Sequence, residues 1–545
     1  MKTRIATWHL LIGVVSVYVA LLLNSFVAIN RYSALQAKYD KALGLVMLEM
    51  VLVLSLTAAI FYLVSIAGRT AFKGIVAVIL ILSAASAYYM FFFKVVIGYG
   101  VIQAVLTTDV DLSKEVVGFA VIGFVAVFGV LPAIGVVRTR LTENVLASRV
   151  LMLAVCMLSG LAVVLVHPLL LRNSDGKTRP QTASALGVVA HSYVPSNWLT
   201  GVAMSALNTY EGVVRQQRLV DPADKFKYRA SVDLDGTYLV IVIGESARYD
   251  RMGILGHSRP NTPEMMRTEN LTAMPAISCN TSTSLSLQCM FVRPEAVDDG
   301  GMSGRQTVSE GMVFAVLKRL GFTSELFAMQ GEVWFYNSVD TNYYKHREII
   351  YAEDRNIGKP IDDMQLVPEL EESILRYPKG RHTIILHTKG SHHLYTFRYP
   401  RSYAWYTPEC MNNELPCAQD ELLNSYDNSI AYTDHVLGQL IEKLKGRKAV
   451  LIYTSDHGES IEKNAHLHGA PKQVAPREQR MVPLVIWASK LFLLDPRNAK
   501  RFSRLQARKG EMASHDNLFD SILGCLGIES DDGGINPHRN LCGEN

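Results

Sequence analysis

Long apolar runs separated by short polar loops occupy the first third of the chain. Each run has about the 20 residues that a helix needs to cross a bilayer. Buried helices of a large soluble core are the alternative, but five such runs in succession favour membrane spans. We therefore predict five transmembrane helices, at residues 9–29, 45–67, 75–93, 116–137 and 150–171.

Lysine and arginine residues in the loops indicate how these helices are oriented. Basic residues precede the first run and lie in the second and fourth loops, which share one side if all five runs cross the membrane. The positive-inside rule makes that side cytoplasmic and places the chain after residue 171 outside. Glu49 is an acid within the second run, and we expect its side chain to reach water at the outer end of the span.

After residue 225 the pattern changes to short, fully apolar runs that alternate with amphipathic segments. β-Branched residues dominate the runs, which predicts buried strands. The segment 425–446, between the second and third runs, has apolar residues at helical spacing. Buried strands separated by such helices predict a doubly wound α/β fold with a mainly parallel sheet. The four strands are expected in TYLVIVIGES, HTIILHTKGSHH, KAVLIYTSDHGES and MVPLVIWAS.

These patterns divide the chain into three parts. We expect a five-helix transmembrane domain at 1–172, a connector at 173–225 and an α/β domain at 226–545. The connector contains an amphipathic helix that begins near Trp198. Such a helix next to a membrane often lies in the interface. An ordinary connecting helix is the alternative.

Cysteine spacing predicts an oxidising compartment for the α/β domain. Of the seven cysteines, Cys156 lies in the fifth run and the other six follow residue 171 as pairs close in sequence. Even numbers and short spacings are typical of disulfides. The net charge of +4 is too small to indicate a nucleic acid as partner. The expected disulfides are Cys279–Cys289, Cys410–Cys417 and Cys525–Cys542.

Carboxylates and imidazoles follow three of the predicted strands. Ligands of open α/β sheets bind at the carboxyl ends of the strands, and this combination of side chains suits zinc. A single acid at a strand end is more often a helix cap, but three strands that end this way favour a metal site. The residues are Glu245, His392, His393, Asp456 and His457, followed by His466 and His468.

The segment SCNTSTSLSLQC offers a nucleophile for such a site. It is rich in hydroxyl groups and is enclosed by Cys279 and Cys289. A disulfide across it would hold one hydroxyl rigidly, and a nearby metal ion would make that hydroxyl a better nucleophile. A simple Ser/Thr-rich loop is the alternative for this segment taken alone.

Taken in order, the motifs GESAR, SCNTSTSLSLQCMF, HTKGSH, SDHGES and LHG resemble those of the lipopolysaccharide phosphoethanolamine transferases. The five spans before an extracytoplasmic domain match as well, so the resemblance covers nearly the whole chain. It implies an alkaline-phosphatase-like catalytic domain in the periplasm and a multi-pass anchor in the bacterial inner membrane. Phrases such as SYVPSNWL, RYPRS and DGGIN look most like the branch that modifies the Kdo sugar of Kdo-lipid A.

The resemblance also implies a role for each motif residue. Thr283 looks like the nucleophile, which takes phosphoethanolamine from phosphatidylethanolamine as a covalent intermediate and passes it to lipopolysaccharide. His392 and His468 look like substrate-side histidines that bind the phosphate or a second zinc ion, one of them protonating the leaving group. A monomer with no nucleic-acid partner is expected. The implied zinc ligands are Glu245, Thr283, Asp456 and His457.

The loop after the third span departs from the family pattern for holding the donor head group. The family often has an Asn, a Thr and a Glu there. In this chain Ala104 stands where the Asn would fall, Thr108 fits, and Glu115 fits only with a shift of register. We expect Thr108 and Glu115 to bind the donor in a site that differs in detail from that of the family.

Several other functions remain as alternatives. Transfer of phosphoethanolamine to a lipid A phosphate or a core heptose changes only the acceptor. A phosphoglycerol transferase or lipoteichoic-acid-type synthase has the same fold, but the three cysteine pairs and the CNTSTSLSLQC phrase disfavour it. The sulfatase nucleophile motif is missing. An inactive membrane sensor or scaffold would have no reason to retain the complete ligand set.

Overall fold

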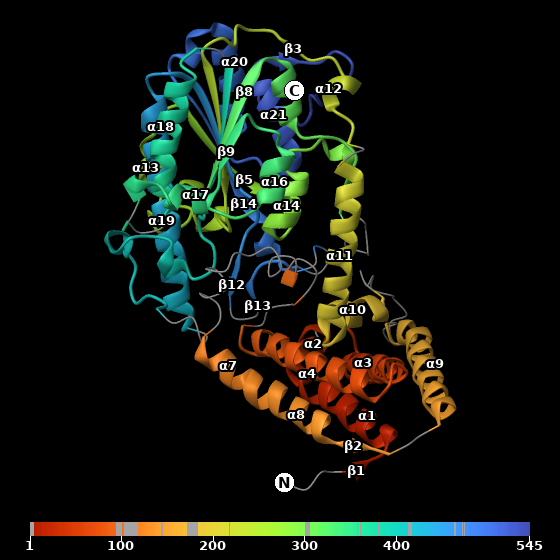
Figure 1. Ribbon diagram of the computed structural model, residues 1–545. Coiled ribbons are helices and arrows are strands. Elements are labelled where there is room, and N and C mark those ends of the chain that lie inside the picture. The colour runs from red at the N-terminus through yellow and green to blue at the C-terminus, as the bar shows by residue number, and fades with distance from the viewer. Residues whose placement is uncertain are drawn as a thin grey trace.

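A bundle of apolar helices is joined to a larger α/β domain (Figure 1). The computed structural model describes residues 5–36, 38–93, 97, 101–102, 118–142, 145–171, 184–216, 219–299, 306–356, 358–359, 362–379, 381–411, 417–462, 465–470, 472 and 475–544.

The bundle accounts for the predicted membrane spans. Four helices are individually long and apolar enough to cross a bilayer, and a fifth span forms if one pair of helices, bent by 45°, is counted as one. The four are α3 (Ala42–Ser65), α4 (Arg69–Phe92), the continuous helix Phe119–Arg138 that contains α7 (Phe119–Val125) and α8 (Leu131–Arg138), and α9 (Leu146–Leu170). The bent pair is Trp8–Leu22, which contains α1 (Trp8–Val17), and α2 (Ser25–Gln36).

Described residues from or next to the basic segments that we expected on one side of the membrane lie at one end of the bundle. Strand β1 (Ile5–Ala6) pairs with β2 (Arg140–Leu141), which joins the N-terminus to the loop before α9. Lys73 donates a hydrogen bond to the carbonyl of Val137 over 3.0 Å. In Figure 1 this end of the bundle points away from the α/β domain. The arrangement agrees with an extracytoplasmic α/β domain.

Glu49 does not reach water, so our expectation for this side chain was wrong. It is fully buried in α3, and Arg31 of α2 donates to both of its carboxylate oxygens, over 2.6 and 3.1 Å. The hydroxyl of Tyr193, in the connector, donates to the same carboxylate over 2.7 Å. A buried carboxylate is tolerated when a cation and hydrogen-bond donors satisfy it. Local sequence could not reveal these partners, since they come from separate elements.

The connector is anchored inside the bundle. It contains α10 (Ala185–Ser192) and α11 (Ser196–Gln216). The buried side chain of Asn24 pairs with both backbone groups of Val194, over 2.8 and 2.9 Å. The indole of Trp198 donates to the hydroxyl of Ser83 in α4 over 3.2 Å. From this anchor α11 rises toward the α/β domain (Figure 1), which favours the connecting-helix alternative.

An eight-stranded sheet forms the centre of the α/β domain, with the order β15-β5-β14-β11-β4-β10-β8-β9. Strands β11, β4, β10, β8 and β9 are parallel neighbours, whereas β14 runs antiparallel to both β11 and β5. The predicted mainly parallel sheet is confirmed. The strands are β4 (Thr237–Gly244), β5 (Leu271–Ile277), β8 (Phe322–Ala328), β9 (Tyr343–Lys345), β10 (Arg381–His387), β11 (Lys448–Ser455), β14 (Met481–Ala488) and β15 (Ala513–Ser514).

Helices cover both faces of this sheet, which explains why its central strands are apolar throughout. All eight residues of β4 are buried. Leu239, Ile241 and Ile243 belong to one hydrophobic core, and Val240 and Val242 belong to the core on the opposite face. Successive side chains of a strand point to opposite faces. The first core is closed by α14 (Thr283–Cys289), α15 (Val313–Arg319), α20 (Pro496–Ala507) and α21 (Leu518–Cys525), the second by α18 (Leu366–Arg376) and α19 (Gln419–Leu444).

The three predicted disulfides are present, at Cys279–Cys289, Cys410–Cys417 and Cys525–Cys542. All three lie in the α/β domain, whereas Cys156 in α9 is a free cysteine. Their position agrees with a domain that folds in an oxidising compartment.

Candidate active site and metal centre

The polar residues that follow β4, β10 and β11 meet at the carboxyl end of the sheet, because these strands are parallel and in register. The amide of Asp456 donates to the carbonyl of Gly244 over 3.0 Å, and the amide of Ser391 donates to the carbonyl of Glu245 over 2.9 Å. Gly390, at φ +50°, allows this approach, since a Cβ atom there would lie 2.8 Å from the carbonyl oxygen of Glu245. The three loops therefore form one site.

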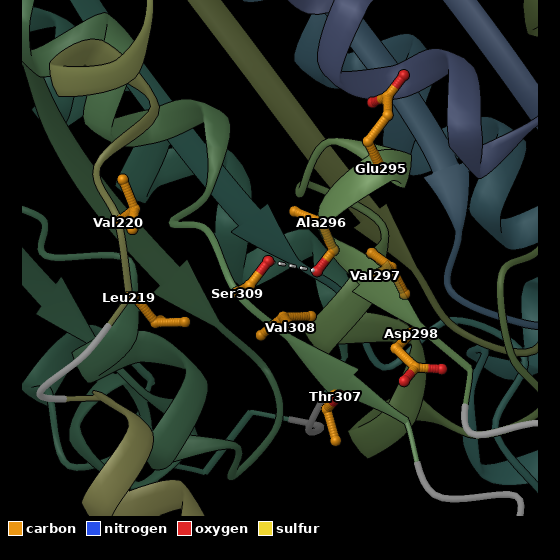
Figure 2. A pocket seen from close by; sticks show the side chains of 9 residues that line it. All are labelled: Leu219, Val220, Glu295, Ala296, Val297, Asp298, Thr307, Val308 and Ser309. Atoms are coloured by element: carbon orange, nitrogen blue, oxygen red, sulfur yellow. Dashed lines mark hydrogen bonds between the residues drawn. The ribbon is translucent and has the colours of Figure 1, made fainter.

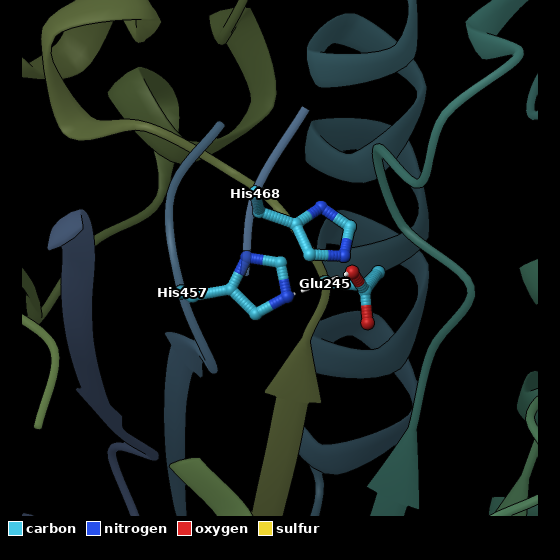
Figure 3. Close-up of side chains that lie close together, drawn as sticks. All are labelled: Glu245, His457 and His468. Carbon is cyan, nitrogen blue, oxygen red and sulfur yellow. Dashed lines mark ion pairs between the residues drawn. The ribbon is translucent and has the colours of Figure 1, made fainter. Parts of the chain in front are cut away.

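Glu245, His457 and His468 form a compact group of ligand atoms. One atom from each residue lies within 4.8 Å of the other two, and Figure 3 shows the two rings and the carboxylate turned toward one another. Glu245 and His457 are fully buried, with Nε2 of His457 3.3 Å from Oε1 of Glu245. Nδ1 of His457 lies 2.8 Å from the carbonyl of Gly458. A carbonyl only accepts, so Nδ1 carries the proton and Nε2 can bind a cation.

Asp456 places a second carboxylate at this group. Its Oδ1 accepts hydrogen bonds from the amides of His457 and Ser246, over 2.7 and 3.3 Å. Its Oδ2 is buried, has no hydrogen-bond partner among the described residues, and lies 3.4 Å from Nε2 of His457. A buried carboxylate oxygen without a donor is costly unless a cation binds it.

The pKa values of these groups depend on one another. Burial by itself raises the pKa of Glu245, but the nearby His457 outweighs it and holds this pKa well below its usual value. Burial lowers the pKa of His457, and the Glu245 carboxylate more than reverses this. Burial, aided by the charge of Glu245, raises the pKa of Asp456 well above its usual value. A divalent cation would replace the shared protons, and two carboxylates with imidazoles suit zinc.

Thr283 is the hydroxyl of the SCNTSTSLSLQC segment that reaches this group. It is the first residue of α14, and its Oγ1 donates to Oε2 of Glu245 over 3.0 Å. The same oxygen lies 3.3 Å from Nε2 of His457. The Cys279–Cys289 disulfide encloses this segment, as a rigidly held nucleophile requires.

His392 and His393 point to different parts of the molecule. The ring of His392 lies 6.0 Å from the ring of His468, on the side of the metal ligands. The ring of His393 instead lies 6.4 Å from that of Phe93, at the end of α4 in the bundle. Burial, with a smaller contribution from Lys389, lowers the pKa of His392 well below its usual value, so the ring is neutral near pH 7.

Three residues that were not predicted as site residues support this site. Nε2 of Gln330 donates to Oε2 of Glu245 over 2.9 Å. Oε2 of the buried Glu459 lies 3.3 Å from Nδ1 of His468. Lys389 lies in the turn between β10 and His392 and is buried. Glu459 stands in SDHGES and Lys389 in HTKGSH, so the motifs contained both, whereas Gln330 follows β8, a strand that the apolar pattern did not predict.

Two of the predicted site residues lie outside the residues that the structure describes. These are Thr108 and Glu115, the expected donor-binding pair. The other predicted site residues lie together at the carboxyl end of the sheet described above. They are Glu245, Thr283, His392, Asp456, His457 and His468.

A separate groove of about 480 Å³ lies at the β6–β7 hairpin (β6, Val297–Asp298; β7, Thr307–Val308). Figure 2 shows the carboxylate of Asp298 near its aliphatic side chains, whereas the carboxylate of Glu295 points away from them. The groove is lined by no imidazole and no cysteine among the described residues, so it lacks the chemistry of the metal ligands. Its remaining lining residues are Leu219, Val220, Ala296, Val297, Thr307, Val308 and Ser309.

Comparison with known proteins places the chain among membrane enzymes. The sequence profile of the family described as phosphoethanolamine transferase EptA/EptB matches residues 53–174, and that of the sulfatases matches residues 237–528. The Kdo(2)-lipid A phosphoethanolamine 7''-transferase of Escherichia coli K12 is 41% identical over 97% of this chain and 95% of its own. The enzyme of the same name from Salmonella typhimurium is 40% identical over the same shares.

A full-length solved structure has the same arrangement of bundle and α/β domain. It is the integral membrane lipooligosaccharide phosphoethanolamine transferase A (EptA) of Neisseria meningitidis. The TM-score is 0.80 at 24% identity, covering 99% of this chain and 98% of that protein. This likeness concerns the fold.

Proposed function

Because the chain belongs to the phosphoethanolamine transferases, membrane enzymes with a periplasmic sulfatase-like domain, we propose that it transfers phosphoethanolamine from phosphatidylethanolamine to lipopolysaccharide. The proposed acceptor is the Kdo sugar of Kdo-lipid A, as the names of the Escherichia coli and Salmonella relatives suggest. A lipid A phosphate or a core heptose is the alternative acceptor. The observation that carries the proposal is the Thr283 hydroxyl, hydrogen-bonded to Glu245 within a group of metal ligands.

We propose a separate role for each of the three parts of the chain. Residues 1–172 anchor the enzyme in the bacterial inner membrane, 173–225 connect, and 226–545 carry the periplasmic active site. We propose that Glu245, Thr283, Asp456 and His457 hold one zinc ion, and that His392 and His468 bind the phosphate or a second ion. When bound, zinc neutralises charge on the transferring phosphoryl group and on the Thr283 oxygen. The unpartnered Oδ2 of Asp456 supports this ligand set.

In the first half-reaction Oγ1 of Thr283 attacks the phosphorus of phosphatidylethanolamine. The Oγ1–P bond forms, the bond between phosphorus and the diacylglycerol oxygen breaks, and diacylglycerol leaves. The threonine proton is lost and the diacylglycerol oxygen gains one. His392 is neutral because it is buried, and a negatively charged phosphoryl group beside the ring would raise its pKa and allow it to accept a proton. We assign the donation of a proton to His468, whose Nδ1 lies 3.3 Å from Oε2 of Glu459.

In the second half-reaction an acceptor hydroxyl attacks the phosphoethanolamine-threonine. The new P–O bond forms as the Oγ1–P bond breaks, the acceptor loses its proton, and Thr283 regains one. Both donor and acceptor are lipids, and the contact between Phe93 of the bundle and His393 supports a site beside the membrane domain. The product gains one ammonium group together with one phosphodiester charge, and we propose that the added ammonium weakens the binding of cationic peptides to the cell surface.

Mass spectrometry of lipopolysaccharide from cells with and without the protein tests this function. A phosphoethanolamine increment that fragmentation places on Kdo is the expected result. An increment on a lipid A phosphate or heptose would change the acceptor, and an added phosphoglycerol would favour the related transferases. Thr283→Ala should abolish the increment while Thr307→Ala, on the β6–β7 hairpin, retains it. An unchanged increment with Thr283→Ala would contradict the catalytic role.

A further inference from the structure

The turn that follows β10 is held firmly against Glu245. The amides of Lys389 and Gly390 both donate to the buried carboxylate of Asp363, over 2.6 and 2.8 Å. Two residues on, the amide of Ser391 donates to the carbonyl of Glu245. The main chain of Lys389 is therefore fixed beside Glu245, a proposed metal ligand.

The ammonium group of Lys389 has no evident structural role. The residue is only 8% exposed. Within the described part of the chain, no hydrogen bond or ion pair engages its Nζ; the hydrogen bonds of this residue are made by its backbone. A largely desolvated ammonium without an acceptor is costly. Such a cost is expected where a ligand reaches the group and supplies the missing anion.

Charged groups of both signs surround Lys389. Arg398 and Arg347 lower its pKa, and the carboxylates of Glu332 and Glu245 raise it. Burial raises the pKa of Glu332 to about 7, so its negative charge is incomplete at neutral pH. Burial and Arg398 lower the pKa of Lys389 to about 8, which still leaves it mainly protonated.

The neighbouring arginines are already engaged. Arg398 donates to the carbonyl of His392 from Nε over 3.2 Å, and to that of His393 from Nη2 over 3.0 Å. The guanidinium of Arg347 lies over the ring of Tyr351, 5.5 Å from its centre. Lys389 is therefore the cation best placed to meet a new anion on the His392 side of the site.

We propose that Lys389 binds an unesterified oxygen of the phosphoryl group that is transferred, on the His392 side of the site. This inference rests on the proposed function. The same phosphoryl group is present in both half-reactions, so Lys389 acts in both. An anion of the acceptor, such as a sugar carboxylate, is the other chemistry that an ammonium could bind, and it would be present only in the second half-reaction.

Half-reaction kinetics of the full-length enzyme in nanodiscs separate these two roles. Lys389→Gln removes the charge and keeps a polar side chain, Lys389→Arg keeps the charge, and Lys490→Gln changes an exposed lysine at the end of β14. We expect Lys389→Gln to slow diacylglycerol release about 100-fold in the absence of acceptor. Lys389→Arg should recover part of the rate, and Lys490→Gln should match the wild type. Bound zinc should be equal in all four proteins.

A binding measurement distinguishes failure of this inference from failure of the proposed function. Calorimetry with phosphoethanolamine as the probe needs no turnover, and Thr283→Ala prevents any reaction. We expect Thr283→Ala/Lys389→Gln to bind about 10-fold more weakly than Thr283→Ala. Equal binding, or a defect confined to the acceptor half-reaction, would overturn the role of Lys389. No diacylglycerol release from the wild type would instead refute the proposed function and, with it, this role.

Discussion

Gln330 is one of the hydrogen-bond donors that orient the Glu245 carboxylate. Its Nε2 donates to Oε2 of Glu245 and to the carbonyl of Thr388, each over 2.9 Å. Nε2 of His387 lies 3.2 Å from Nε2 of Gln330, and Nδ1 of His387 lies 3.1 Å from the hydroxyl of Tyr336. Burial lowers the pKa of His387 to about 4, which keeps the ring neutral. This chain of buried polar groups holds the proposed metal ligand Glu245 in one orientation.

Replacing Gln330 should weaken metal binding without removing a ligand. Gln330→Leu keeps most of the volume and loses the donor, so Glu245 can rotate away from the metal. We expect zinc affinity to fall about 10- to 100-fold. Competition with a chelating indicator on the purified full-length protein measures this. Gln439→Leu, on the partly exposed side of α19, serves as the control, and equal affinities for the two variants would contradict the role of Gln330.

At the scale of elements, His382 joins β10 to its neighbours through buried hydrogen bonds. Nδ1 lies 2.7 Å from the hydroxyl of Thr323 in β8, and Nε2 lies 2.8 Å from that of Ser373 in α18. Burial lowers the pKa of His382 from 6.5 to about 4. The folded protein therefore binds this proton less tightly than the unfolded chain does.

The α/β domain should lose stability as the pH falls below 6.5. The stability linked to His382 is complete above pH 6.5 and disappears between about pH 6.5 and 4, a loss of roughly 3 kcal/mol. His382→Gln can keep both hydrogen bonds but cannot gain this charge, so its unfolding midpoint should change less between pH 7 and 5. Thermal unfolding at a series of pH values tests this. His538→Gln, at an exposed site, should follow the wild type, and a wild-type profile for His382→Gln would refute the assignment.

The Arg31–Glu49–Tyr193 contact fastens the connector to two helices of the bundle. Breaking a buried pair by removing one partner leaves an uncompensated charge and costs about 3–5 kcal/mol. Glu49→Leu should therefore lower the unfolding midpoint in detergent strongly. Arg31→Leu/Glu49→Leu should recover part of this loss, because no charge is left without its partner. A double variant less stable than Glu49→Leu would show that the charge of Arg31 has other partners.

At the scale of the whole molecule, the carboxyl end of the sheet, where the candidate active site lies, faces the bundle. The antiparallel β12 (Ser460–Glu462) and β13 (Ala465–Leu467) lie on this side of the α/β domain (Figure 1). The ring contact between Phe93 and His393 crosses from one domain to the other. The residue next to His392 of the site is therefore in contact with the bundle.

Removing the metal should destabilise the whole α/β domain, because the metal ligands come from the ends of different strands. A tightly bound ion at 1,000 times its Kd stabilises the folded state by about 4 kcal/mol. Chelation should lower the unfolding midpoint, and added zinc should restore it. Glu245→Gln should lose this zinc-dependent shift while Glu269→Gln, on the surface, keeps it. If chelators do not change the unfolding midpoint, the result would argue against a bound metal.

Much of the architecture was determined by local sequence. Membrane helices and central strands are read from continuous apolar runs, because a span or a strand buried on both faces has few polar positions. The disulfides were predictable because each joins cysteines separated by 7 to 17 residues. The candidate ligands were predictable because Glu245, Asp456 and His457 directly follow apolar strands.

Other features were decided only by the tertiary structure, because they depend on residues far apart in the chain. Strand β8 was missed since "FTSELFA" mixes polar and apolar positions, and with it Gln330 was missed as the partner of Glu245. Antiparallel β14 reads as one more apolar strand until its neighbours are known. From the sequence, the side chain of Glu49 is expected to reach water, and only the packed structure shows that Arg31 and Tyr193 bind it. Apolar runs record whether a residue is buried, but only the folded chain determines which polar groups are buried together.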